Sequence, residues 1–309
     1  MTSQSNNPGL TSIVSYPDRG AGGNNKYRGN CSPKLVEDLL RHFKAQQISD
    51  YMCGSNSTKA AADKLGVESH TFDLHSGFDM LAHDIPDRPE MIFWHPPYHD
   101  IVRYADSMYS AADVQQRFGY DPCKSDLSQI KSWEEFVKVM NNCMMKQFTA
   151  LETGGRMAVL VGDIKKKGKL YSMIFELIKP GIIENVIIKA QYNCMSNSRQ
   201  YSGNFIPILH EYVLLLKKAM PLSYPVMMSF SQDLDIRNMP GAAWKDILAD
   251  AMESFSGAAP LERIYAAVGG YARTQSSAHW QDKVRQTLQY YPNLFCSTQR
   301  GVWALRKAA

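Results

Sequence analysis

The sequence predicts an α/β fold with a mostly parallel sheet, followed by a small helical module. Short apolar runs at 91–94 and 157–161 have the composition of strands that are buried on both faces. A strand at 48–52 enters a glycine-containing turn and then a helix, as in nucleotide-binding α/β units. From Trp244 onward the pattern changes to three amphipathic helices and a short hairpin.

Composition sets the limits of this prediction. A chain of 309 residues is long enough for one sizeable domain and a second small one. The formal charge of +4 permits a polyanionic partner without requiring one. The six cysteines form no Cys-x-x-Cys pair, so neither a zinc ribbon nor a disulfide framework is indicated, and reduced cytoplasmic thiols fit best. No apolar run suggests a signal segment or a membrane span, so no membrane partner is expected.

The expected organisation has four segments. They are an irregular N-terminal arm at 1–25, an α/β domain at 26–220, a linker at 221–240 and a C-terminal domain at 241–309. Residues 99–130 lack clean periodicity and are expected to form a partly ordered lid or a target contact. Late strands are expected at 182–190 and 211–217, and a strand at 70–74 is expected to end near Asp73.

The strand at 91–94 ends abruptly in His95-Pro96-Pro97-Tyr98. Two prolines cannot continue a sheet ladder, so the chain must leave the sheet in a fixed turn. In an open α/β sheet this exit lies at the carboxyl ends of the strands, where ligands bind. Backbone carbonyls, His95 and the ring of Tyr98 would meet there. Acceptors beside an aromatic face suit a planar base that carries an exocyclic amine.

This loop resembles the (Asp/Asn/Ser)-Pro-Pro-(Tyr/Phe) motif of S-adenosylmethionine-dependent amino methyltransferases, which methylate adenine or cytosine in DNA. The chain departs from the motif at its first position, which is His95. The resemblance implies a Rossmann-like methyltransferase sheet with a closing β-hairpin, and S-adenosylmethionine as cofactor. It also implies the catalytic residues His95, Pro96, Pro97 and Tyr98. The Pro96 carbonyl and a ring nitrogen of neutral His95 would accept hydrogen bonds from the target amine, and Tyr98 would stack on a flipped-out base.

The preceding strand and turn carry the expected cofactor residues. The family motif Asp-x-(Phe/Cys)-x-Gly-x-Gly is matched at Asp50 and Gly54, while Asn56 stands at the second glycine. Asparagine is the next most tolerant residue for left-handed backbone angles. Asp73 follows at the spacing of a ribose-binding carboxylate. The full set of expected cofactor-binding residues is Asn30, Ser32, Pro33, Asp50, Cys53, Gly54, Ser55, Asp73, Asp79 and Met80.

Two regions are expected to contact nucleic acid. One is the lysine run at 165–167 together with the polar loop 193–204 of the late hairpin. The other is the outward face of the helix at 279–290. This helix belongs to the C-terminal segment, which resembles the winged-helix modules appended to restriction–modification enzymes. The expected contacts are Lys165, Lys166, Lys167, Arg199, Lys283, Arg285, Gln286, Gln289 and Arg300.

The resemblance therefore implies a site-specific DNA methyltransferase, with adenine N6 favoured as the methylated atom. Double-stranded DNA is the expected partner, with a restriction or mobile-element protein as a second expected partner. The protein is expected to be a monomer or homodimer in the cytoplasm, associated with the nucleoid. Four alternatives stay open: cytosine N4 methylation, a structured-RNA methyltransferase, a degenerate DNA-binding protein, and a metal enzyme using His95, His99 and Asp100. The methyltransferase reading itself requires no metal.

Overall fold

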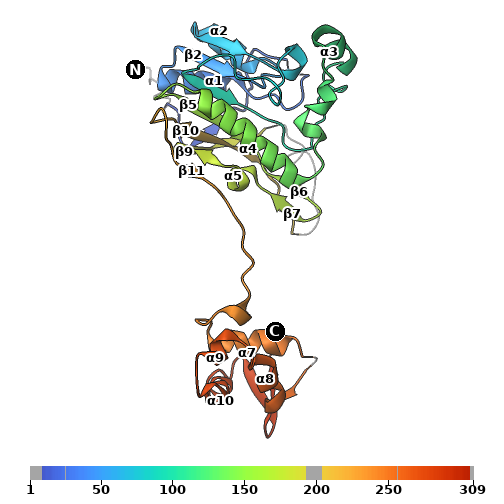
Figure 1. The fold of residues 1–309 in the computed structure, drawn as a ribbon, viewed down its shortest axis with the longest axis vertical. Helices are drawn as coiled ribbons and strands as arrows, with labels where there is room; N and C mark the ends of the chain where they lie inside the picture. Colours follow the sequence, from blue (N-terminus) through green and yellow to red (C-terminus); the bar gives the residue numbers. More distant parts are fainter. Residues whose placement is uncertain (1–8, 25, 193–203, 256, 307–309) are drawn as a thin grey trace, which may run out of the picture. The chain divides into compact units, whose positions relative to one another are not determined.

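The chain forms two compact units, residues 1–230 and 231–309, and the boundary lies inside the segment 221–240. The computed structural model describes residues 9–24, 26–192, 204–255 and 257–306 (Figure 1). None of the helices within these ranges is both long enough and apolar enough to cross a membrane.

The first unit is built on a seven-stranded sheet in the order β1-β9-β10-β5-β4-β2-β3. Strand β10 runs antiparallel to both of its neighbours, and the other neighbouring pairs are parallel. The strands are β1 (Ile13–Ser15), β2 (Gln47–Asp50), β3 (Glu68–Thr71), β4 (Met91–Trp94), β5 (Arg156–Val161), β9 (Ile182–Ala190) and β10 (His210–Lys217). The mostly parallel sheet and the late antiparallel pair expected from the sequence are both confirmed.

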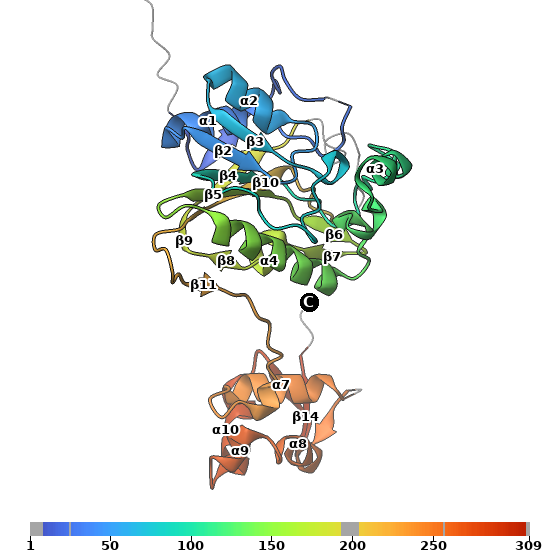
Figure 2. The ribbon, with the colours of Figure 1, turned by 45° about the horizontal axis from the view of Figure 1, so that its top comes forward.

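Helices cover both faces of this sheet, as Figures 1 and 2 show. Helices α1 (Pro33–Phe43) and α2 (Ser57–Leu65) pack on one face, and α4 (Trp133–Ala150) packs on the other. Strand β4 is buried along its whole length because alternate side chains enter different cores. Met91 and Phe93 join the α1–α2 core, while Ile92 and Trp94 join the α4 core. This double burial explains why the strand is a continuous apolar run.

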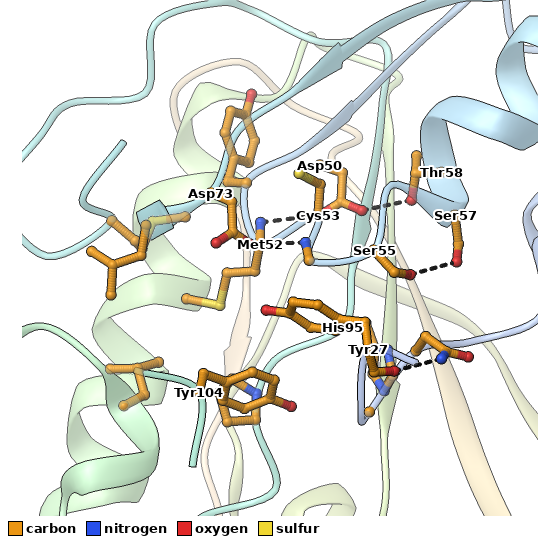
Figure 3. A pocket seen from close by; sticks show the side chains of 18 of the residues that line it. Tyr27, Asp50, Met52, Cys53, Ser55, Ser57, Thr58, Asp73, His95 and Tyr104 are labelled. Carbon is orange, nitrogen blue, oxygen red and sulfur yellow. Dashed lines mark hydrogen bonds between the residues drawn. The ribbon is translucent and has the colours of Figure 1, made fainter. Parts of the chain in front are cut away.

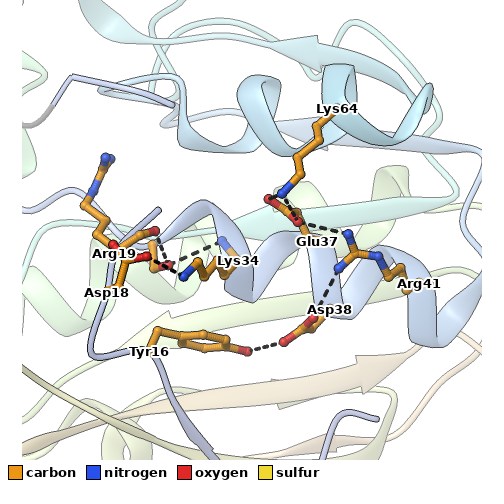
Figure 4. A network of polar contacts seen from close by, with 9 residues as sticks. Tyr16, Asp18, Arg19, Lys34, Glu37, Asp38, Arg41 and Lys64 are labelled. Atoms are coloured by element: carbon orange, nitrogen blue, oxygen red, sulfur yellow. Dashed lines mark hydrogen bonds and ion pairs between the residues drawn. The ribbon is translucent and has the colours of Figure 1, made fainter. Parts of the chain in front are cut away.

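The expectation of an irregular N-terminal arm is partly wrong. Strand β1 pairs in parallel with β9 and so extends the edge of the sheet. The hydroxyl of Tyr16 then donates to the Asp38 carboxylate at 2.7 Å, and Lys34 pairs with Asp18 at 2.9 Å (Figure 4). Only Val14 of this short strand is buried, so its local sequence carries little strand signal. Pairing with a distant strand decides its conformation.

Two further segments differ from the expectation. The segment 99–130 contains helix α3 (Ala111–Phe118), whose only buried residue is Val114. A single buried position leaves no periodicity, but the Ser110 N-cap and the Gly119 C-cap mark the helix ends. The lysine run at 165–167 lies in the hairpin of β6 (Ile164–Lys166) and β7 (Lys169–Tyr171). Strand β3 also ends before Asp73, which instead caps a 3-10 turn.

In its described residues, 231–255 and 257–306, the second unit has four α-helices, a 3-10 turn at Ile236–Asn238 and a three-stranded sheet in the order β12-β14-β13. Its elements are α7 (Trp244–Glu253), β12 (Ala259–Pro260), α8 (Leu261–Val268), α9 (Ala272–Gln275), α10 (Trp280–Tyr290), β13 (Phe295–Gln299) and β14 (Val302–Leu305). On α10, Val284 and Leu288 are fully buried and Trp280 is partly buried, as the four-residue spacing predicted. Helix α9 and strand β12 were not expected.

Candidate active site

A pocket opens at the carboxyl ends of β2 and β4, and about 770 Å³ of non-atom space, partly open to solvent, lies within it. Figure 3 shows that residues from several separate segments of the chain converge on it. Its lining combines apolar and aromatic side chains with a few polar groups, as small-molecule and cofactor sites do. Of the residues expected in the site, those that line it are Asn30, Asp50, Cys53, Gly54, Ser55, Asp73, Met80, His95 and Pro97.

The β2–α2 turn forms one wall and is held closed by Asp50. One carboxylate oxygen accepts from the Thr58 hydroxyl at 2.6 Å, and the other accepts from the Met52 amide at 3.0 Å. Burial raises the pKa of Asp50 to about 7. These contacts make Asp50 the anchor of the turn. Asn56 has φ 60° and ψ 32°, so the left-handed conformation expected for the second glycine position is confirmed.

Replacing Asn56 by Ala is expected to lower the free energy of unfolding by about 1 kcal/mol, because alanine is strained in the left-handed region. Asn56→Gly should leave that free energy unchanged or slightly increased, since glycine adopts φ 60° without strain. Urea denaturation of the two variants beside the natural chain measures both values. Equal stability of the Ala and Gly variants would contradict the backbone explanation.

Asp73 lies at the centre of the pocket wall. One oxygen accepts from the Gly54 amide at 2.8 Å, and the other contacts Nδ1 of His75 at 2.5 Å. The carboxylate therefore fixes the glycine turn and retains lone pairs toward the pocket. Asp79, by contrast, is absent from the lining. One of its oxygens accepts from the Leu81 amide of its own turn at 2.8 Å, and the other accepts from the Ser125 hydroxyl of the segment 99–130.

The residues expected before the first helix divide in a similar way. Asn30 lines the pocket, whereas Ser32 and Pro33 do not. The Ser32 hydroxyl accepts from the Lys34 amide at 3.3 Å and donates to the carbonyl of Arg19 at 2.8 Å. Ser32 is thus the N-cap of α1, and it also ties the N-terminal segment to the helix.

The Pro-Pro loop leaves β4 and brings His95 and Pro97 into the lining, but not Pro96 or Tyr98. The hydroxyl of Tyr98 donates to Glu211 at 2.7 Å, and Nε2 of His95 lies 3.1 Å from the same hydroxyl oxygen. Glu211 also binds Nζ of Lys189 at 2.6 Å.

The surroundings of this loop keep His95 neutral. Burial is the main cause that lowers the pKa of His95 to about 4. Sequence reasoning missed Glu211 and Lys189, although charged residues inside two expected strands were a signal.

An aromatic wall was also missed. Tyr104 and Tyr109 come from the segment 99–130 and line the pocket together with Tyr27, which precedes α1. Figure 3 shows Tyr27 and Tyr104 on this side of the pocket. The ring centroids of Tyr27 and Tyr104 are 5.8 Å apart. Burial raises the pKa of all three phenols, so each remains neutral. The tyrosines interleaved with polar residues in this segment were the available signal, and their position is consistent with a lid over the pocket.

Two of the three lysines expected to contact nucleic acid near the sheet, Lys165 and Lys166, are bound to other groups of the protein. Lys166 forms an ion pair with Asp100 and lies 3.0 Å from Nδ1 of His99. Lys165 donates to the Ile206 carbonyl at 2.8 Å. Lys167 occupies the hairpin turn with φ 50°. Arg199 falls outside the described residues.

Of the residues of the metal alternative, His99 and Asp100 lie 3.4 Å apart, but only His95 lines the pocket. The imidazole of His99 packs against Trp133 and Phe136, with ring centroids 5.7 and 5.1 Å away, whereas His95 faces the pocket. Within the ranges that the structure describes, no group of three or more His, Cys, Asp or Glu could hold a metal ion.

Comparisons with known proteins give weak similarities. No protein-family model matches the chain, and no curated protein matches it. Among solved structures, TehB from Haemophilus influenzae matches at 12% identity and a TM-score of 0.27, over 60% of this chain and 62% of that one. Phosphoethanolamine N-methyltransferase 2 from Haemonchus contortus, solved with S-adenosylhomocysteine, matches at 8% identity and a TM-score of 0.29, over 72% of this chain and 41% of that one. At these scores, neither match supports a statement about this chain's substrate.

Proposed function

We propose that this chain is an S-adenosylmethionine-dependent methyltransferase that acts on the exocyclic amine of a flipped-out DNA base, with adenine N6 as the favoured target. One observation carries the proposal. The Gly54 turn, Asp73 and the His95-Pro96-Pro97-Tyr98 loop are distant in sequence, yet Gly54, Asp73, His95 and Pro97 line one pocket. These are the elements whose order resembles the amino methyltransferases.

The residues of the pocket fit the proposed cofactor. Asp73 presents a carboxylate to ribose hydroxyls, and Phe78 and Met80 supply an apolar slot for the adenine ring. Asn30 and Ser55 add polar groups for the amino-acid end of the cofactor. S-adenosylmethionine, when bound, supplies an electrophilic methyl group. Burial keeps Cys31 and Cys53 protonated by raising the pKa of both thiols, so neither is a ready nucleophile.

The chain's own task in the reaction is to orient and activate the amine. An exocyclic amine is a poor nucleophile because its lone pair is delocalised into the ring. A hydrogen bond accepted from the amine, by a ring nitrogen of neutral His95 and by the Pro96 carbonyl, localises that lone pair. The expected stacking of Tyr98 on the base remains part of the proposal, and comparing Tyr98→Ala with Tyr98→Phe separates the ring from the hydroxyl.

Methyl transfer is expected to persist well below neutral pH and to fall only as the pH passes about 4, the pKa of His95. Above that value the imidazole is neutral and can accept a hydrogen bond; below it, both nitrogens carry protons. Initial rates measured between about pH 8 and pH 3, with circular dichroism at each pH, test this. His95→Asn should lack the acidic fall. A rate that halves near pH 6.5 in the folded natural chain but not in His95→Asn would contradict it, whereas a fall shared by both chains would report Asp50, whose pKa is about 7.

We also propose that the C-terminal unit is a winged helix that holds duplex DNA. Its element order is one helix, a short strand, three helices and a hairpin, and residues 295–305 form the hairpin. Lys283, Arg285, Gln286 and Gln289 are exposed on the side of α10 opposite its buried residues, and Arg300 is exposed at the hairpin turn. Such a face suits phosphate and base-edge contacts.

Lys283→Ala in the full chain is expected to weaken DNA binding several-fold and to reduce the slope of log affinity against log salt by about one. The reason is the loss of one phosphate contact. Fluorescence anisotropy with a labelled duplex at several salt concentrations measures both quantities. Lys245→Ala, on the exposed side of α7, is the matched control and should bind like the natural chain. Equal losses in the two variants would contradict a specific role for α10.

The deciding experiment measures cofactor binding and methyl transfer separately. Calorimetry tests S-adenosylmethionine binding, and labelled methyl transfer is then followed to duplex DNA, single-stranded DNA and structured RNA, with nucleoside analysis. N6-methyladenine in the DNA product supports the proposal. N4-methylcytosine would show that the target base is cytosine and not adenine. Transfer to RNA alone would overturn the DNA assignment. A chain that fails to bind the cofactor would be the degenerate DNA-binding protein.

A further inference from the structure

We propose that Glu211, paired with Lys189, acts through the Tyr98 hydroxyl to fix the tautomer of His95, so that Nδ1 is the acceptor offered to the target amine. Glu211, Lys189 and Tyr98 are positioning residues in this scheme, because they act through His95. The inference deepens the proposed function and rests on it.

The ionised state of Glu211 is the first step. Glu211 and Lys189 are register partners on the antiparallel strands β10 and β9. They are only 6% and 8% exposed, and Nζ of Lys189 lies 2.6 Å from one carboxylate oxygen. Although burial opposes ionisation, the charge of Lys189 leaves the pKa of Glu211 below its ordinary value. Glu211 is therefore a carboxylate at neutral pH.

The direction of the next hydrogen bond follows from that charge. A carboxylate has no proton and can only accept. The Tyr98 hydroxyl, 2.7 Å from the other oxygen of Glu211, must therefore donate its single proton to it. Burial, followed by the charge of Glu211, raises the pKa of Tyr98, so the phenol keeps that proton.

Only one neutral tautomer of His95 is then compatible with these hydrogen bonds. The Tyr98 oxygen has already donated its proton, so toward Nε2 of His95, at 3.1 Å, it can only accept. Nε2 must carry the proton, and in a neutral imidazole the lone pair is then on Nδ1. Within the part of the chain that the structure describes, Nδ1 has no hydrogen-bond partner, and His95 lines the pocket. An acceptor is thus offered to an incoming donor.

The chain of hydrogen bonds accounts for the departure of His95 from the family motif. Asp, Asn and Ser each carry an oxygen that accepts regardless of its surroundings. A neutral histidine offers an acceptor on only one nitrogen, and which one is set by the bond that the other nitrogen makes. Gly162 contributes to this arrangement: a Cβ at that position would lie 2.6 Å from the Tyr98 ring. The glycine leaves room for Tyr98 to reach Glu211.

Nitrogen-15 NMR of histidine-labelled protein, with His95 assigned from the spectrum of His95→Gln, tests the tautomer directly. The natural chain should have its His95 proton on Nε2. Tyr98→Phe should shift His95 toward a mixture of tautomers. Tyr16→Phe is the matched control because Tyr16 also donates to a carboxylate at 2.7 Å, away from the pocket (Figure 4). A proton on Nδ1 in the natural chain, or an unchanged tautomer in Tyr98→Phe, would overturn the proposal.

The carboxylate itself is tested by Glu211→Gln in the same spectra. A glutamine side chain can donate as well as accept, so it no longer dictates the direction of the Tyr98 bond. Glu37→Gln is the matched control, since Glu37 is also buried and binds two cations, Arg41 at 3.0 Å and Lys64 at 2.8 Å (Figure 4). A mixed His95 tautomer in Glu211→Gln alone supports the role, and an unchanged tautomer in both variants overturns it.

A double-mutant cycle connects the tautomer to the reaction. Tyr98→Phe is expected to lower kcat about 10-fold when position 95 is histidine, with the dissociation constant of the cofactor unchanged. In a His95→Asn background the same change should cost less than about twofold, because asparagine needs no partner to present its oxygen. Equal losses in the two backgrounds would overturn the proposal.

Failure of the proposed function gives a different pattern. A natural chain that holds its proton on Nε2 yet transfers no methyl group would leave the hydrogen-bond chain standing. It would overturn the assignment of Nδ1 to a target amine.

Discussion

Replacing His95 by Ala is expected to reduce the single-turnover rate of methyl transfer by about 100- to 1,000-fold. The substitution removes a side-chain acceptor that lines the pocket and leaves the amine with backbone carbonyls alone. Cofactor affinity should change little, because β2 and the turn after it, which carry Asp50 and Gly54, and Asp73 after β3 stay in place. Rapid-quench measurement with labelled cofactor gives the rate, and calorimetry gives the affinity.

Two further variants define the role of His95. His95→Asn should retain most of the rate, since asparagine is one of the residues found at this position in the motif that the loop resembles. His42→Ala, on the exposed side of α1, controls for the loss of an imidazole elsewhere. If His95→Ala retains more than about a tenth of the natural rate, an accepting role for His95 in the chemical step is wrong.

Replacing Asp73 by Ala is expected to raise the dissociation constant of S-adenosylmethionine by about 10- to 100-fold, corresponding to the loss of hydrogen bonds to a charged group. The substitution of Asp73 by Ala has two effects on the pocket. It removes the proposed ribose acceptor, and it releases the Gly54 amide that the carboxylate holds at 2.8 Å. Isothermal titration calorimetry on the full chain measures the constant.

Asp63→Ala is the matched control because this carboxylate is exposed on α2 and pairs with Lys59 at 3.0 Å. It should bind the cofactor like the natural chain. Asp73→Asn separates the two effects of Asp73, since its amide oxygen still accepts from Gly54 while its charge is lost. Unchanged affinity in Asp73→Ala would mean that the pocket binds a different ligand or binds the cofactor elsewhere.

Local patterns predicted the parts of the fold that are buried on both faces or capped by their own residues. Strand β4 begins and ends where its apolar run does, because all four side chains are buried. Helix α1 begins at Pro33 because Ser32 caps it and the proline is tolerated in the first turn. The left-handed Asn56 also follows from residue type. Strand β1 and helix α3 escaped prediction because each buries only one side chain.

The sequence by itself determined the Pro-Pro exit from the sheet, the glycine turn and the carboxylate after β3, since proline, glycine and spacing act locally. The tertiary structure alone decided which of these residues share a pocket and which partners they have. It engaged Asp79 with Leu81 and Ser125 instead of the pocket, and it brought Glu211 and Lys189 next to Tyr98 of the Pro-Pro loop. The physical reason is long-range strand register. Only the pairing of β9 with β10 sets these two charges opposite each other beside Tyr98.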